Sequence, residues 1–166
     1  HLGYPTLQFA LAEAALRGWI SGTPADTYYE NAIRAAMEFT AENTPDNILF
    51  HNGRKITPEY IETYLQQDKV KLSGTFEEQL EKILTQRYLG TFMQSGFDSY
   101  FEYRRTGYPD LPVNPASNNN TVPDRIPIRW MYPDTEVNYN NENLNKALQS
   151  QYGGNDDFNE KMWLLK

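Results

Sequence analysis

The sequence contains no cysteine, only two histidines and no long apolar run. Without cysteine the chain cannot form disulfides, thiolate nucleophiles or cysteine-based zinc sites, although its cellular compartment stays open. No stretch approaches the roughly 18 apolar residues that a membrane-spanning helix needs. The 15 Lys and Arg are outnumbered by 22 Asp and Glu, whereas polyphosphate-binding proteins carry a basic footprint. We therefore expect no nucleic-acid partner and no transmembrane segment.

The remaining composition is that of a folded globular protein with many aromatic side chains. Hydrophobic residues make up 39% of the 166 residues and charged residues 22%, which excludes wholesale disorder. This length fits one domain or a large piece of one. The chain opens on His1 without an initiator Met or a signal peptide, so we expect it to be truncated at its amino end.

Two amphipathic helices joined by a short turn are expected at the start of the chain. The first should begin at Pro5, and its partner-facing stripe is expected to be Leu7, Leu11, Ala14 and Gly18. Thr23 should cap the second helix, which would start at Pro24 and end before Pro45. Its apolar stripe is expected to be Tyr29, Ala32, Ile33, Ala36 and Met37. This pattern is typical of a tetratricopeptide-like hairpin, which cannot bury its faces alone.

Local signals predict three further helices before residue 107. Thr57 and Pro58 should start one of them. Thr75 and Glu78 form a capping box that should open a long helix reaching toward Phe92. A short helix is expected over residues 97–105.

The chain after Thr106 differs in character, because it holds six of the ten Pro and many Asn. Residues 107–141 show no sustained period, so we expect an irregular but ordered course, followed by a helix that Asn141 and Glu142 cap and that ends before Gly153. Buried rings should hold residues 104–133 in place, namely Tyr108, Trp130 and Tyr132. Residues 118–120 should be its loosest point.

The predicted fold is mostly α. It consists of a tetratricopeptide-like helical hairpin plus further helices within residues 1–106. Residues 107–166 form a long irregular carboxy-terminal segment, a Pro/Asn-rich wrap of the same domain.

Several segments together carry a family resemblance. They are residues 13–20 with 28–33, Gln86-Arg87-Tyr88-Leu89, residues 103–109 (YRRTGYP), residues 126–133 (IPIRWMYP) followed by Glu136, Asn138, Asn143 and Ala147, and residues 153–157 (GGNDD) with Trp163. In this order they are similar to the last hairpin and four later motifs of the SusD-like (SusD/RagB) lipoproteins. Ile128 and Leu164 depart from the pattern, since the family often has Arg and Trp there.

The resemblance implies the carboxy-terminal part of a non-enzymatic, outer-membrane protein on the surface of a Bacteroidetes-type bacterium. Such a protein captures oligosaccharide or polysaccharide and hands it to a SusC-like TonB-dependent transporter. It touches the membrane only through a lipid anchor, whose Cys is absent from this chain. No cofactor is implied, and the resemblance selects neither a particular glycan nor glycan over peptide.

A second interpretation stays open. The chain would be a helical protein-interaction scaffold that docks the transporter, while the missing amino-terminal part holds the ligand. Exposure separates the two, because glycan binding needs exposed aromatic residues along a groove and a scaffold buries them.

Possible sugar contacts are aromatic, because the C–H face of a pyranose packs well on a flat ring. The candidates are Trp19, Trp130, Tyr108 and Tyr132. Trp163 carries the same ambiguity. Large aromatic residues are nevertheless more often core residues, and we expect burial to be the commoner role of all three Trp.

Polar candidates have structural explanations that we favour. Arg104 and Arg105 could bind an acidic sugar, but such a pair more often closes helix ends or pairs with carboxylates. Neighbouring Glu77 and Glu78 point in different directions on a helix, so they cannot form a glycosidase pair. Residues 155–159 offer oxygen ligands without a known calcium spacing, and His51 has no partner for a zinc site. We predict no catalytic, cofactor or metal residues.

Overall fold

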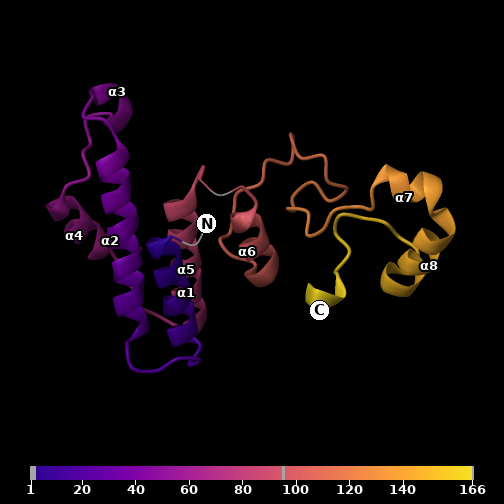
Figure 1. Ribbon diagram of the computed structural model, residues 1–166, viewed down its shortest axis with the longest axis horizontal. Helices are drawn as coiled ribbons and strands as arrows, with labels where there is room; N and C mark the ends of the chain where they lie inside the picture. Colours follow the sequence, from indigo (N-terminus) through magenta and orange to yellow (C-terminus); the bar gives the residue numbers. More distant parts are fainter. Residues whose placement is uncertain (1–2, 95, 166) are drawn as a thin grey trace. The chain divides into compact units, whose positions relative to one another are not determined.

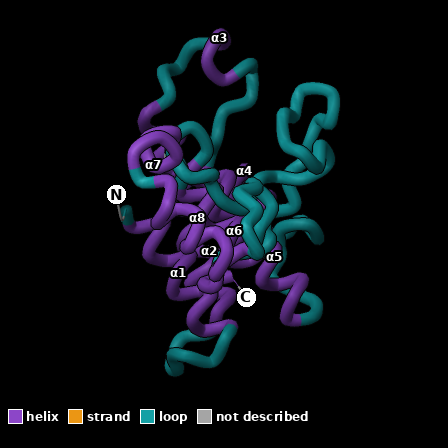
Figure 2. The backbone as a smooth tube through the Cα atoms, turned by 90° about the vertical axis from the view of Figure 1, so that its right-hand side faces the viewer, coloured by secondary structure: helices purple, strands orange, loops and turns teal. Residues whose placement is uncertain are grey.

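A computed structural model describes residues 3–94 and 96–165. His1 and the side chain of Leu164 therefore lie outside what is described. The described residues form helices and loops without a strand (Figures 1 and 2), which confirms the predicted mostly α class. The chain divides into two compact units, residues 1–109 and 110–166.

The described part of the first unit contains the helices α1 (Tyr4–Leu16), α2 (Ala25–Asn43), α3 (Ile48–His51), α4 (Pro58–Leu65), α5 (Phe76–Thr91) and α6 (Asp98–Thr106). Helix α1 packs on α2 as the predicted hairpin, and both contact α5. The core residues are Phe9, Ala12, Tyr29, Ala32, Ile33, Ile61, Leu65, Val70 and Ile83. Gly90 allows α5 to approach closely, because a Cβ there would lie 3.3 Å from Ala36 Cβ.

The predicted inner face of α1 is wrong. Helix α1 buries Gln8, Phe9, Ala12 and Glu13, whereas Leu7 of the predicted stripe is 48% exposed. The reason is that α1 carries apolar residues on nearly every side, so their spacing does not select one face.

Helix α2 buries Tyr29, Ala32 and Ile33, as its apolar stripe predicts, and it ends at Asn43. The Tyr29 hydroxyl donates to the Val70 carbonyl at 2.6 Å, which ties α2 to the loop after α4. The predicted cap is wrong: Pro24 occupies the N-cap position with an extended backbone, so Thr23 lies one residue too early to bond the first turn.

The capping signals of α4 and α5 are confirmed. Thr57 accepts from the Tyr60 N–H at 3.2 Å. At α5 the Thr75 N–H donates to Glu78 at 2.6 Å, and the Glu78 N–H donates back to Thr75 Oγ1 at 3.3 Å. Short helix α3, capped by Asn47, was not predicted.

The second unit contains α7 (Asp134–Tyr139), α8 (Asn141–Tyr152) and the 3-10 turn η1 (Trp163–Leu165). Helix α7 lies inside the stretch expected to be irregular, so that part of the prediction is wrong. Helix α8 ends before Gly153 as expected, but its N-cap is Asn140. The buried apolar side chains described in this unit are Leu144 and Leu148, so polar contacts must supply much of its order.

Candidate functional site

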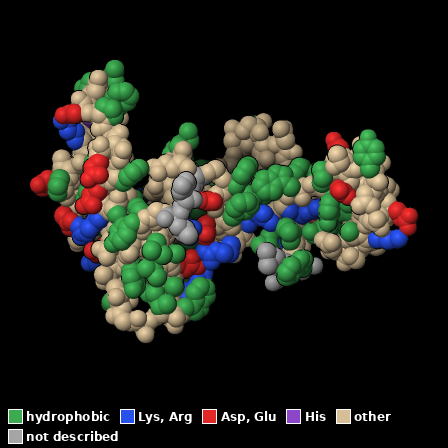
Figure 3. Space-filling model, viewed as in Figure 1, with side chains coloured by type: hydrophobic (Ala, Val, Ile, Leu, Met, Phe, Trp, Pro, Cys, Tyr) green, Lys and Arg blue, Asp and Glu red, His purple; other side chains and the backbone are tan. Residues whose placement is uncertain are grey.

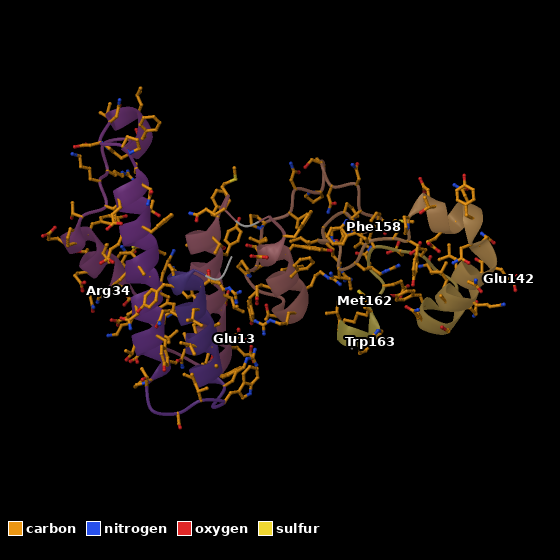
Figure 4. The ribbon with its side chains drawn as sticks, in the orientation of Figure 1. Glu13, Arg34, Glu142, Phe158, Met162 and Trp163 are labelled. Carbon is orange, nitrogen blue, oxygen red and sulfur yellow. The ribbon has the colours of Figure 1, made fainter. Side chains whose placement is uncertain are left out.

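A network of charged side chains joins three helices of the first unit around Glu13, which is labelled on α1 in Figure 4. Arg105 of α6 donates to both Glu13 oxygens, at 2.8 and 2.7 Å, and Arg17 donates to Oε1 at 2.8 Å. Arg105 also bonds Glu102 at 2.6 Å, and Arg87 of α5 pairs with Glu102 at 3.0 Å. The ion-pair interpretation of Arg105 is therefore confirmed.

Burial and the two arginines act in opposite directions on Glu13. Burial alone would raise the pKa of this carboxyl, but hydrogen bonds from Arg105 and Arg17 outweigh it and hold the pKa below its usual value. The same bonds to Glu13 raise the pKa of the Arg105 guanidinium. Both groups are thus charged at neutral pH.

Trp19 stands at the end of α1, just beyond Gly18, whose φ of +72° turns the chain out of the helix. Its side chain is 71% exposed. The Arg17 guanidinium lies 5.3 Å from the Trp19 ring and 5.7 Å from the Phe76 ring, so it contacts two aromatic residues while bound to Glu13. This arrangement holds the indole against the charged network and leaves its surface open.

Arg129 organises the second unit. It is 4% exposed, pairs with Asp156 at 2.7 Å and donates to the Asp157 carbonyl at 3.0 Å. Its guanidinium also lies 4.4 Å from the Tyr152 ring and 5.5 Å from the Tyr132 ring. Tyr132 is thereby fixed beside a buried cation.

An amide cluster closes the loops of the second unit. Asn120 and Asn159 exchange side-chain hydrogen bonds at 2.7 and 3.0 Å, and Asn159 and Thr121 both bond Asp157. Asn118 donates to two backbone carbonyls of the same loop. These bonds remove the reason for expecting residues 118–120 to be the loosest point. Among the described residues no three His, Cys, Asp or Glu are placed to hold a metal.

The four predicted sugar contacts are divided between the units. Trp19 and Tyr108 belong to the first, and Trp130 and Tyr132 to the second. The three Trp are exposed, Trp19 by 71%, Trp130 by 52% and Trp163 by 75%, so their expected burial is wrong and Trp130 is not a buried anchor. Tyr108 and Tyr132 are half-buried.

Sequence reasoning missed Glu13 as the centre of the charged network. A carboxylate on an apolar helix was the available signal, since a buried charge requires a partner. The partner itself lies 92 residues away, and no local pattern indicates it.

Comparisons with known proteins identify the relatives of this chain. Residues 1–133 match the SusD-like family described as starch-binding and associating with the outer membrane. A SusD homolog of Bacteroides fragilis is 57% identical with a TM-score of 0.88, over 99% of this chain and 35% of that chain. A second one is 41% identical with a TM-score of 0.80, over 99% and 34%.

A Bacteroides vulgatus outer membrane protein, whose suggested role is nutrient binding, is 38% identical with a TM-score of 0.79, over 99% and 34%. A comparison with curated proteins gave no match. This chain thus spans about a third of the solved relatives it matches. In the part of the chain that is described, no helix is long and apolar enough to cross a bilayer. With one family matching most of the sequence and close relatives sharing the fold, the chain belongs to the SusD-like family.

Proposed function

We propose that the protein is part of a non-enzymatic subunit that captures glycan at the outer membrane for a SusC-like TonB-dependent transporter. A lipid anchor outside this chain would hold it at the cell surface. The observation that carries the proposal is the match of residues 1–133 to a family described as starch-binding and associating with the outer membrane. The relatives named above support the same role, since one of them has nutrient binding as its suggested function.

Exposed aromatic side chains support glycan rather than peptide as the ligand. Trp19 offers a flat apolar surface beside Arg17, which can donate hydrogen bonds to sugar hydroxyls. Trp130 offers a second such surface in the other unit. We therefore keep Trp19, Trp130, Tyr108 and Tyr132 as proposed contacts.

The ionised Glu13 of the charged network is unsuited to be the acid of a glycoside hydrolase. Glu13 and Glu102 both bond Arg105, so the structure does bring two carboxylates together. A glycosidase needs one carboxyl that stays protonated to act as the acid. Glu13 has a lowered pKa and is fully ionised at neutral pH, so it is unsuited to that role.

Affinity electrophoresis against a panel of polysaccharides that includes starch tests the proposal. We expect this chain alone to be retarded weakly or not at all, because the matched part is about a third of the relatives. A protein of the relatives' length that contains this chain should be retarded by at least one polysaccharide, and Trp19→Ala should reduce that retardation. If no polysaccharide retards the longer protein, glycan capture is refuted.

A second function is favoured by a groove of about 420 Å³ in the first unit. Its lining includes four small residues, namely Gly3, Ala35, Ala36 and Gly90. Tyr4 and Phe39 also line it and are 57% and 52% exposed. Small residues together with exposed rings suit the close approach of another helix, so this face fits a scaffold that docks protein.

The double variant Tyr4→Ser/Phe39→Ser tests the scaffold interpretation. We expect it to weaken co-purification with the transporter and to leave glycan retardation unchanged. Tyr139→Ser, at a residue 90% exposed in the second unit, is the control. Unchanged co-purification of the double variant would refute docking at this groove.

A further inference from the structure

A separate cavity lies where α2 ends, between that helix, α3 and the loop that leads to α4. Its volume is about 430 Å³, within the range of about 300–1,000 Å³ that is usual for small-molecule sites. Both backbone views place α3 at the far end of this loop, away from α1 and α5 (Figures 1 and 2). The cavity is therefore distinct from the Trp19 surface and from the groove beside Tyr4.

The polar wall of this cavity is cationic although the chain carries a net charge of −7. Its charged lining residues are Asp46, Arg54 and Lys55, with His51 beside them. Lys55 Nζ bonds both Asp46 oxygens, at 2.6 and 2.7 Å, so this pair is neutral as a whole. The Arg54 backbone N–H donates to the His51 carbonyl at 2.8 Å, whereas its exposed side chain forms no hydrogen bond or ion pair with the described residues. Its guanidinium is the charge left over for an anionic ligand.

His51 is fixed in one orientation by two bonds. Its Nδ1 accepts from the Gly53 N–H at 3.2 Å, so a neutral His51 carries its proton on Nε2. Nε2 lies 3.3 Å from Asp46 Oδ1. The left-handed turn at Asn52, with φ +49°, brings Gly53 to this position. Asp46 thus contacts both His51, at the end of α3, and Lys55, in the loop that follows.

The lining of the cavity also includes apolar side chains and an aromatic ring. Ile56 and Ala41 line it together with Phe50, which is 65% exposed. Hydrophobic and charged side chains of both signs gather side by side at this end of the unit in Figure 3. A ligand that fits must combine a flat apolar face, hydrogen-bonding groups and a negative charge.

We propose that this cavity binds an acidic monosaccharide unit, a hexuronate, within a larger glycan. The carboxylate of the sugar pairs with Arg54, because a planar guanidinium can bind a carboxylate through two parallel hydrogen bonds. The C–H face of the ring packs on Phe50. Sugar hydroxyls donate to the remaining lone pairs of the Asp46 oxygens. This inference extends the proposed glycan capture to a charged class of ligand and a second location.

Titration of the 166-residue chain, followed by ¹H–¹⁵N NMR, tests the inference with three probes. These are D-glucuronate, neutral D-glucose and hexanoate, a carboxylate without a sugar ring. Glucuronate should shift amides of residues 44–57, and glucose should bind at least about ten-fold more weakly, since it lacks the charge. If glucose bound as tightly as glucuronate, the need for an acidic group would be refuted. If hexanoate bound as tightly as glucuronate, the need for a sugar ring would be refuted.

Matched variants locate the binding. Arg54→Gln should weaken glucuronate at least about ten-fold, whereas Arg125→Gln, at an exposed arginine of the second unit, should not. Phe50→Ala should weaken it as well. Leu49→Ala is the neighbouring control, because Leu49 is 84% exposed and does not line the cavity.

The experiments distinguish failure of the cavity proposal from failure of the glycan-capture proposal on which it rests. Glycan binding by the longer protein with no shifts at residues 44–57 would refute the cavity and keep the proposed function. Specific glucuronate shifts that Arg54→Gln abolishes would support the cavity, even if no polysaccharide retards the longer protein.

Discussion

At the scale of single residues, Glu13 combines burial with full ionisation. Its side chain is 8% exposed, and its charge is balanced by Arg17 and Arg105. A buried pair adds little compared with an apolar replacement, yet removing one partner leaves an uncompensated charge. The stability of the first unit should therefore be sensitive to Glu13→Gln, which replaces one carboxylate oxygen with an amide nitrogen.

Glu13→Gln should lower the free energy of unfolding by about 2 kcal/mol, because three charge-assisted bonds weaken or are lost and Arg17 loses its counterion, while Arg105 keeps only Glu102. Urea denaturation followed by circular dichroism measures this loss. Glu142→Gln is the matched control, since Glu142 forms an exposed pair with Lys146 and should change stability by less than about 0.5 kcal/mol. Equal losses in the two variants would contradict the special role of Glu13.

The same residue should contribute to acid sensitivity. The folded pKa of Glu13 is lower than its ordinary value of 4.5, so its contribution is fully present above that value. It is lost as the pH falls through the lower folded pKa. Between pH 7 and about pH 3.5, the wild-type chain should therefore lose more stability than Glu13→Gln. If the free energy of unfolding fell equally with pH in the wild-type chain and in Glu13→Gln, this expectation would be contradicted.

At the scale of helices, the two faces of α1 can be told apart by mutation. Phe9 is 1% exposed and its ring lies 6.4 Å from that of Tyr29, so Phe9→Ala should cost about 3–5 kcal/mol through the cavity it leaves. Leu7→Ala, on the half-exposed side, should cost less than about 1 kcal/mol. Thermal or urea unfolding compares them. A larger cost for Leu7 would restore the face that the sequence pattern favoured.

The capping signals of α4 and α5 were predicted correctly, whereas the inner face of α1 was not, and the reason is physical. The capping box of Thr75 and Glu78 satisfies backbone groups within four residues, so its signal is complete in the local sequence. The inner face of α1 depends on α2 and α5, which no local pattern places. Glu13 and Arg105, as well as Asn120 and Asn159, meet over long separations for the same reason.

The candidate site shows the same division. Arg105 was correctly assigned to carboxylate pairing, because pairing with Asp or Glu is the commoner chemistry of Arg in a chain rich in acidic residues. The exposure of Trp19, Trp130 and Trp163 was not foreseen, since an aromatic residue in a sequence is equally compatible with a core and with a binding surface.

At the scale of the whole chain, the two units differ in what stabilises them. The first has an apolar core that spans α1, α2, α4 and α5. In the described part of the second unit, the buried residues are two apolar ones, Leu144 and Leu148, and two polar ones, Arg129 and Asn120. Polar networks give order only while every member is satisfied, so we expect the second unit to respond sharply to the loss of one amide.

Asn159→Ala should expose residues 116–126 to limited proteolysis, because Asn159 bonds Asn120, Thr121 and Asp157 at once. Asn145→Ala is the control, since Asn145 makes one exposed bond to Asn141 within α8. Mass spectrometry of early fragments gives the cleavage sites. Equal cleavage in both variants would show that the amide cluster does not hold the loop.

The separation of Glu13 from Arg105 also has a consequence for synthesis on the ribosome. Arg105 follows Glu13 by 92 residues, which takes about 5–18 s at roughly 5–20 residues per second. Throughout that interval the first hairpin carries an acidic group whose principal counterion does not yet exist. Arg17, four residues away, is made almost at once and can neutralise Glu13 until α6 emerges. The nascent hairpin thus has a temporary partner for the charge that the finished fold later encloses.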